Sequence, residues 1–189
     1  MSYFPMMVEL DNKKVLVIGS GEEGRKKTQI LHEFGAVITL ISKDALKEAV
    51  EMASVFEERE FRDTDIDEQY ELIVAATDDR ELNKRISTLA KKNKIPVNVV
   101  DDTELCTFIF PAIVKDRDVV CAVSSGGKSP YITQHIKSLL LSILPGNIGI
   151  INDRMGEYRK QAKSEIADTA ERRRFLRKKL DEELKKSGS

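Results

Sequence analysis

The sequence has few of the residues that build metal sites, disulfide frameworks and membrane spans. Its 189 residues include two cysteines, two histidines and no tryptophan. Two cysteines are too few for a disulfide framework or a four-thiolate metal site. No stretch approaches the roughly 20 apolar residues of a membrane span, and the N-terminus shows no signal peptide. We therefore expect a cytoplasmic protein that has no membrane association and no resident metal.

The sequence also lacks an excess of charge of one sign, since it has 31 basic and 32 acidic residues. This balance argues against nucleic acid as a partner. The charge is nevertheless uneven: residues 152–189 carry 12 basic and 8 acidic side chains, and residues 1–151 carry 19 and 24. Apolar residues at helical spacing predict that this basic tail is a charged helix lying against another surface; they are Met155, Tyr158, Ala162, Ile166, Leu176, Leu180 and Leu184.

Strand-like and helix-like segments alternate along the first hundred residues. Short β-branched runs predict strands at 14–19, 37–41, 54–58, 72–76 and 96–100. Helical patterns lie between them, at 22–34, 44–52 and 79–92. The alternation predicts an α/β fold, a Rossmann-type parallel sheet with helices on both faces. Later segments predict an antiparallel strand pair and an amphipathic helix, at 108–114, 119–124 and 130–144.

A glycine-rich loop follows the first predicted strand. Gly19, Gly21 and Gly24 have the spacing of a dinucleotide-binding loop, in which they allow a tight turn, a close pyrophosphate and close helix packing. Glu22 and Glu23 fall in the first helical turn, where they suit the helix dipole but lie near an incoming pyrophosphate. We expect their side chains to turn outward while their backbone amides bind. A glycine-rich turn without a ligand is the alternative.

An acid about 20 residues after the loop would bind the ribose hydroxyls of the dinucleotide. Asp44 lies at that distance, two residues beyond the expected end of the second strand and after Ser42 and Lys43. A carboxylate there favours NAD, whereas Lys43 could instead bind the 2′-phosphate of NADP. We expect NAD as the cofactor, with Ser42, Lys43 and Asp44 at its ribose.

Further motifs carry a resemblance to a known family. They are Tyr3-Phe-Pro5, the segment Ala75-Ala-Thr-Asp-Asp-Arg-Glu-Leu-Asn83, the segment Pro96-Val-Asn-Val-Val-Asp-Asp-Thr-Glu-Leu-Cys-Thr-Phe-Ile-Phe-Pro111, and Ala122-Val-Ser-Ser-Gly-Gly-Lys-Ser-Pro130. Over residues 1–145 the chain resembles the precorrin-2 dehydrogenase/sirohydrochlorin ferrochelatase family, the N-terminal module of siroheme synthases.

This resemblance implies an activity and an architecture. Members of the family oxidise precorrin-2 to sirohydrochlorin with NAD, and some also insert Fe²⁺ to give siroheme. They are homodimers. The division that the resemblance implies is a Rossmann domain over 1–112, a dimerisation region over 113–145 and a charged helical C-terminal domain over 146–189.

The resemblance also assigns residues. Asp101 matches the aspartate implicated in both reactions, and as a carboxylate after a parallel strand it could accept a substrate proton; a turn cap is its alternative. Ala76 and Thr77 are expected to line the cofactor, although Thr77 could also cap the next helix. The loop after the strand pair is expected to contact substrate through Ser124, Ser125, Gly126 and Lys128; Ser125 matches a position that some siroheme synthases phosphorylate.

Two questions stay open at this stage. Precorrin-2 carries eight carboxylates in the family's chemistry, so basic residues of the tail are expected to face it, with Arg154, Arg159, Lys160 and Lys163 as candidates. The histidines and cysteines lack partners at ligand spacing, which leaves iron insertion undecided. The alternative function is a redox-sensing regulatory module that binds a dinucleotide and uses the basic tail on nucleic acid or a partner protein.

Overall fold

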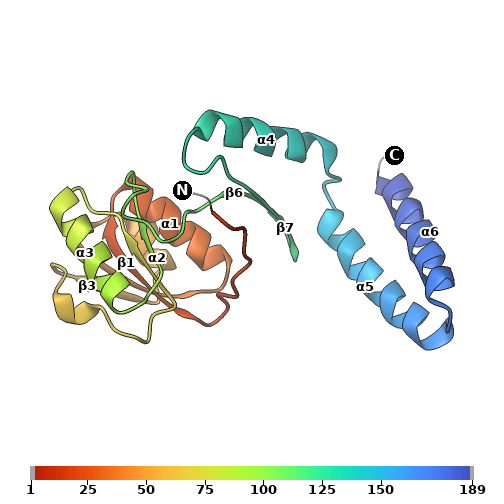
Figure 1. Ribbon diagram of the computed structural model, residues 1–189, viewed down its shortest axis with the longest axis horizontal. Coiled ribbons are helices and arrows are strands. Elements are labelled where there is room, and N and C mark those ends of the chain that lie inside the picture. The colour runs from red at the N-terminus through yellow and green to blue at the C-terminus, as the bar shows by residue number, and fades with distance from the viewer. Residues whose placement is uncertain (1–2, 188–189) are drawn as a thin grey trace. The chain divides into compact units, whose positions relative to one another are not determined.

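The computed structural model describes residues 3–187 and divides the chain into two compact units, Met1–Phe110 and Pro111–Ser189 (Figure 1). The first unit is a five-stranded parallel sheet in the order β3-β2-β1-β4-β5. Its strands are β1 (Lys14–Ser20), β2 (Val37–Ala45), β3 (Val55–Glu58), β4 (Leu72–Ala75) and β5 (Val97–Val99). Its helices are α1 (Glu22–Glu33), α2 (Lys47–Met52), the 3₁₀ turn η1 (Asp63–Asp65) and α3 (Arg80–Lys92). The expected Rossmann-type sheet is confirmed.

The sheet is buried on both faces because successive side chains of a strand point to opposite sides. In β1, Leu16 and Ile18 join a core cluster with Ile86 of α3, whereas Val15 and Val17 join a second cluster with Leu31 of α1. The second cluster also contains a residue of α2, so α1 and α2 cover one face and α3 the other. Two-sided burial explains why these strands read as continuous apolar runs.

The second strand is longer than its apolar run predicts. It continues to Ala45, so Ser42, Lys43 and Asp44 belong to the carboxyl end of β2, and α2 begins only at Lys47. The expected helix start at residue 44 is wrong. The register explains the extension, because Ser20 of β1 pairs with Ala45 after an irregularity at the glycine loop. Hydrogen bonding to β1 thus keeps the end of β2 extended, although its residues after Ile41 are mostly polar.

The second unit begins with an antiparallel pair, β6 (Ala112–Asp116) and β7 (Val119–Val123), and continues into α4 (Pro130–Ile143). The expected strand over 108–114 begins four residues later than predicted. Ser129 caps α4 by accepting a hydrogen bond from the amide of Ile132, and Pro130 occupies the first turn, where proline is favoured. No residue of α4 is buried in this chain.

The basic tail forms two helices instead of one, α5 (Ile148–Glu165) and α6 (Thr169–Ser187). They pack against each other around a buried carboxylate, that of Glu183, whose side chain is 3% exposed. Arg154 of α5 and Lys186 of α6 both pair with Glu183, at 2.5 and 2.8 Å. Tyr158 packs edge-on against Phe175, with ring centroids 6.5 Å apart. The surface against which the tail lies is therefore partly the tail itself.

Candidate functional site

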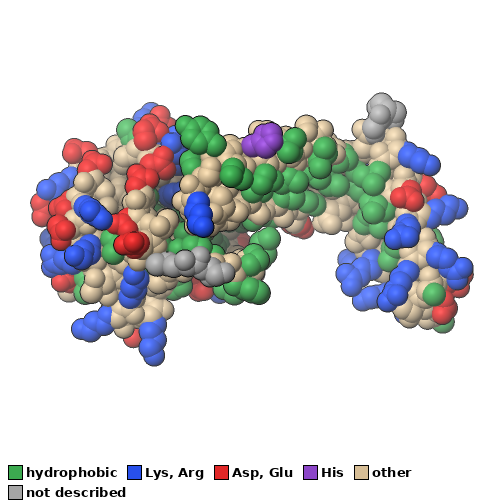
Figure 2. Space-filling model, turned by 45° about the horizontal axis from the view of Figure 1, so that its top comes forward, with side chains coloured by type: hydrophobic (Ala, Val, Ile, Leu, Met, Phe, Trp, Pro, Cys, Tyr) green, Lys and Arg blue, Asp and Glu red, His purple; other side chains and the backbone are tan. Residues whose placement is uncertain are grey.

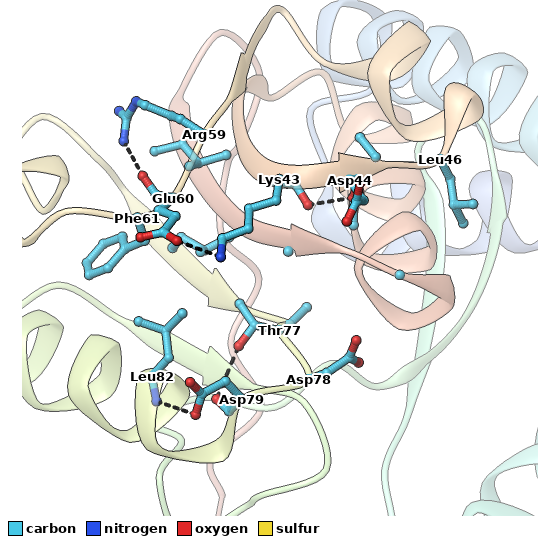
Figure 3. A pocket seen from close by; sticks show the side chains of 18 of the residues that line it. Lys43, Asp44, Leu46, Arg59, Glu60, Phe61, Thr77, Asp78, Asp79 and Leu82 are labelled. Atoms are coloured by element: carbon cyan, nitrogen blue, oxygen red, sulfur yellow. Dashed lines mark hydrogen bonds and ion pairs between the residues drawn. The ribbon is translucent and has the colours of Figure 1, made fainter.

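A pocket of about 1030 Å³ opens at the carboxyl ends of β1, β2 and β4 (Figure 3). The chain reverses its direction of winding here, because β2 lies on one side of β1 and β4 on the other. Open α/β sheets bind ligands at this kind of switch point. The predicted cofactor residues that line the pocket are Gly19, Gly21, Ser42, Lys43, Asp44, Ala76 and Thr77. The pocket thus joins three sequence segments that were assigned separately.

The three glycines of the loop have different surroundings. Gly19 has φ +89°, and a Cβ there would collide with the carbonyl of Ala76. A Cβ on Gly24 would collide with the carbonyl of Gly19. A Cβ on Gly21, by contrast, would meet nothing within 4 Å. Gly19 and Gly24 therefore bring the strands and α1 together, whereas Gly21 leaves open space in the pocket lining for a ligand to approach the backbone.

The start of α1 offers backbone amides in place of side chains. Gly21 is the N-cap, and no side chain caps the helix. Glu22 and Glu23 pair with Arg25 and Lys26 of the same helix, at 3.4 and 2.6 Å, and neither glutamate lines the pocket. The carboxylates are engaged along the helix surface, so the amides of the first turn face an anion without a competing cap.

The end of β2 forms one wall of the pocket. The hydroxyls of Ser20 and Ser42 both donate to the backbone carbonyl of Asp44, at 3.1 and 2.7 Å, and so fix the strand end. The Lys43 ammonium pairs with Glu60 at 2.5 Å. This partner raises the pKa of Lys43 and lowers that of Glu60. No sequence pattern points to Glu60, because its partner Lys43 lies 17 positions earlier.

The opposite wall follows β4. Thr77 is held by Asn83: its hydroxyl donates to the Asn83 side-chain oxygen at 2.7 Å, and the Asn83 amide donates to the Thr77 carbonyl at 2.8 Å. The N-cap of α3 is Asp79, which accepts from the amides of Glu81 and Leu82. The alternative role of Thr77 as the helix cap is therefore wrong. Asn83 closes the motif that begins at Ala75, and that motif was the signal for it.

Asp101 lies at the same sheet edge, beyond β5. The amide of Val100 donates to the carbonyl of Ala75 at 3.0 Å, which places Asp101 one residue past the strand pairing. It has φ +59°, is exposed and does not line the pocket. Burial lowers the pKa of Lys27, which sits 4.8 Å from the Phe110 ring, and the negative charge of Asp101 opposes this lowering. The neighbouring Asp102 pairs with Arg80.

The predicted substrate loop belongs to the second unit and connects β7 to α4. The amide of Gly126 donates to the Ser124 hydroxyl, and Ser125 exchanges two hydrogen bonds of 3.0 Å with the backbone of Ser129. Lys128 is exposed. The Ser125 hydroxyl thus holds the residue that caps α4, and substrate contact by this loop stays a prediction.

The side chains that could ligate a metal do not gather in the described part of the chain. Within residues 3–187 no three His, Cys, Asp or Glu side chains are placed to hold an ion together. Cys106 is buried, and burial raises the pKa of its thiol. That thiol donates to the carbonyls of Val99 and Asp102, both at 3.3 Å, which ties the Asp101 turn to β5. Iron insertion stays a prediction.

Comparison with known proteins decides the family. A family model described as "Putative NAD(P)-binding" matches residues 6–112, which contain the whole pocket. The chain belongs to this NAD(P)-binding family. The glycine loop, the open backbone at Gly21 and the acid at the end of β2 fit a dinucleotide, as expected of the family.

The relatives agree with the resemblance drawn from the motifs. The chain is 38% identical over 182 residues to a siroheme synthase of Ruthia magnifica and 34% identical over 180 residues to one of Tolumonas auensis. Both alignments cover 94% of the chain but only 38% of the relative. The solved structure of SirC, a precorrin-2 dehydrogenase, superimposes with a TM-score of 0.70 at 20% identity and covers 98% of this chain and 99% of SirC. The resemblance to siroheme synthases is confirmed, and the SirC likeness shows the fold.

Among the helices within residues 3–187, none is both long enough and apolar enough to cross a membrane.

Proposed function

We propose that this chain is a cytoplasmic, NAD-dependent dehydrogenase that oxidises precorrin-2 to sirohydrochlorin in siroheme biosynthesis. The observation that carries the proposal is the position of Asp101, a carboxylate on the same sheet edge as a dinucleotide pocket. The motif containing Asp101 is also the one shared with the precorrin-2 dehydrogenase family. Siroheme synthases among the relatives and the SirC fold support the same substrate.

The residues of the pocket have separate tasks in this proposal. The amides of the first turn of α1 bind the pyrophosphate, and the open space at Gly21 lets it approach. Asp44 accepts hydrogen bonds from the ribose hydroxyls. Thr77, held by Asn83, orients the part of the dinucleotide next to β4. Bound NAD supplies the acceptor for the hydride that leaves the substrate.

Asp101 is the base that accepts the substrate proton in this proposal. Loss of a hydride and a proton converts precorrin-2 to sirohydrochlorin, and the exposed Asp101 carboxylate accepts the proton and returns it to water. The left-handed backbone at Asp101 is a conformation that aspartate and asparagine tolerate better than most residues. Placing a short carboxylate at this edge of the sheet therefore costs little conformational energy.

The carboxylates of the substrate need cations. Arg154, one candidate from the tail, already forms an ion pair with Glu183. We therefore assign the binding of substrate carboxylates to other exposed cations, which are Arg159, Lys160 and Lys163 of α5 and Lys128. This assignment predicts a rise in KM for precorrin-2 when two of these charges are removed together. It also predicts that the rise shrinks at high salt, because exposed charges are screened.

A substitution at Asp101 tests the catalytic role. We expect Asp101→Asn, which keeps the left-handed turn but removes the base, to lower kcat by about 10²-fold or more, measured as NADH formation from precorrin-2 and NAD. The matched control is Asp102→Asn, which removes a neighbouring carboxylate paired with Arg80 and should retain most of the activity. Full turnover by Asp101→Asn would show that the carboxylate is not the base. An inactive wild-type chain that still binds NADH would point to another substrate.

We also propose that the protein is a homodimer and that α4 supplies its interface. Several large apolar side chains of α4 are exposed: Tyr131, Ile132, Ile136, Leu139, Leu141 and Ile143. Figure 2 shows hydrophobic side chains gathered along this part of the chain. Contiguous apolar surfaces on soluble proteins mark interfaces. Light scattering of the full chain and of Ile136→Glu tests this, since the charged variant should be a monomer.

A further inference from the structure

Each basic side chain that lines the dinucleotide pocket is already paired with an acid of this chain. Figure 3 shows Lys43 and Glu60 on one side of the pocket, opposite Thr77 and Leu82. The pairs and their N–O distances are Lys43–Glu60 at 2.5 Å, Arg59–Asp65 at 2.8 Å and Arg85–Asp63 at 2.8 Å. Among the described residues, the pocket lining contains five acidic and three basic side chains. A ligand with an extra phosphate therefore meets a wall that is net negative.

The position of the first pair matters most, because it lies where a dinucleotide-binding sheet holds the adenosine ribose. Ser42 of β2 pairs in register with Glu58 of β3. Lys43 and Glu60 thus meet just past the last paired residues, next to Asp44. A free lysine at this point would suit the 2′-phosphate of NADP. In this chain the Lys43 ammonium is instead paired with the Glu60 carboxylate.

We propose that Glu60 is a specificity-determining residue that selects NAD over NADP by holding Lys43. Asp44 accepts hydrogen bonds from a free 2′-hydroxyl and repels a 2′-phosphate. Glu60 pairs with Lys43, a lysine that could otherwise compensate for this repulsion. The inference rests on the proposed dinucleotide site and adds to it the residue that sets the cofactor.

Arg59 does not take over the role of Lys43. Its guanidinium binds both oxygens of Asp65 at 2.8 Å, Glu57 at 2.7 Å and the Glu60 carbonyl at 2.9 Å. Its side chain is only 24% exposed. The Lys43 side chain is 66% exposed and has one acidic partner. Removing one carboxylate therefore releases Lys43, whereas the contacts of Arg59 with Asp65 and Glu57 stay in place.

The test is equilibrium binding of NADH and NADPH to the full chain, followed by the fluorescence of the nucleotide. Wild type should bind NADH more tightly. In Glu60→Gln the ratio of NADPH affinity to NADH affinity should rise about tenfold, which corresponds to about 1.4 kcal/mol. Glu58→Gln is the matched control, because Glu58 is an exposed glutamate two positions earlier that does not line the pocket. It should keep the wild-type ratio.

A second variant identifies the cation. If Lys43 is what Glu60 holds, Glu60→Gln/Lys43→Met should lose the gain seen in Glu60→Gln. An unchanged ratio in a Glu60→Gln protein that still binds NADH overturns the inference and leaves the proposed NAD-dependent dehydrogenase intact. A wild-type preference for NADPH overturns the inference together with the NAD dependence of the proposed function. Failure of the wild-type chain to bind either nucleotide instead overturns the dinucleotide site on which the proposed function depends.

Discussion

The two units of the chain bury apolar surface to very different extents. Of the buried hydrophobic residues among 3–187, 21 lie in the first unit and two, Ile151 and Ala162, in the second. The first unit is a sheet covered on both faces, whereas α4 of the second has no buried residue. The first unit can thus be stable by its own core, and the second depends on other interactions.

In the second unit, ion pairs take part of the role that apolar packing has in the first unit. Glu183 is the one charged residue among the buried side chains of residues 3–187, and it is satisfied by Arg154, Lys186 and Tyr158. A buried carboxylate is stable only with such partners. An apolar core therefore sets the fold of the NAD(P)-binding unit, while paired charge sets the register of α5 on α6.

The largest expected effect is on the first unit's core. Ile73→Ala removes a fully buried side chain of β4 and should lower the free energy of unfolding by about 2–5 kcal/mol, measured by urea denaturation. Leu139→Ala on α4, where the side chain is 50% exposed, should cost about 0.5 kcal/mol in a single copy. A loss at Leu139 as large as that at Ile73, growing with protein concentration, would show that a second copy buries α4.

A smaller effect separates packing from binding within the glycine loop. Gly24→Ala forces a methyl group against the Gly19 carbonyl and should destabilise the first unit by about 1–3 kcal/mol. Gly21→Ala meets no neighbour and should cost less than about 1 kcal/mol, yet weaken NADH binding on the order of tenfold. Equal NADH affinity in wild type and Gly21→Ala would mean that the pyrophosphate lies elsewhere.

The smallest effect concerns pH and the second unit. Hydrogen bonds from Lys186 and Arg154 lower the pKa of Glu183 to about 2, from an ordinary value of 4.5. The stability that this carboxylate contributes is therefore present above pH 4.5 and lost as the pH falls toward 2. Thermal melts of helical circular dichroism between these values should show the loss in wild type and much less of it in Glu183→Gln. Asp181→Asn, an exposed acid on the same helix, should behave as wild type.

Much of the first unit could be predicted because its signals are local. The apolar run at 14–19 and the glycines after it specify a buried strand and a tight turn whatever lies around them. Prediction failed where a neighbouring strand decided the outcome. The end of β2 is polar, and only its pairing with β1 shows that Ser42, Lys43 and Asp44 continue the strand.

The α/β alternation, the glycine loop and the family motifs that contain Asp101 follow from the sequence alone, because periodicity and turn chemistry depend on adjacent residues. Three contacts become visible in the folded chain alone: Glu60 pairs with Lys43, Asn83 holds Thr77, and the tail folds back so that Glu183 is buried beside Arg154. Each of these contacts joins side chains from different elements or from an element and a loop. Packing of the elements brings these side chains together. No pattern along the chain predicts which side chains will pair.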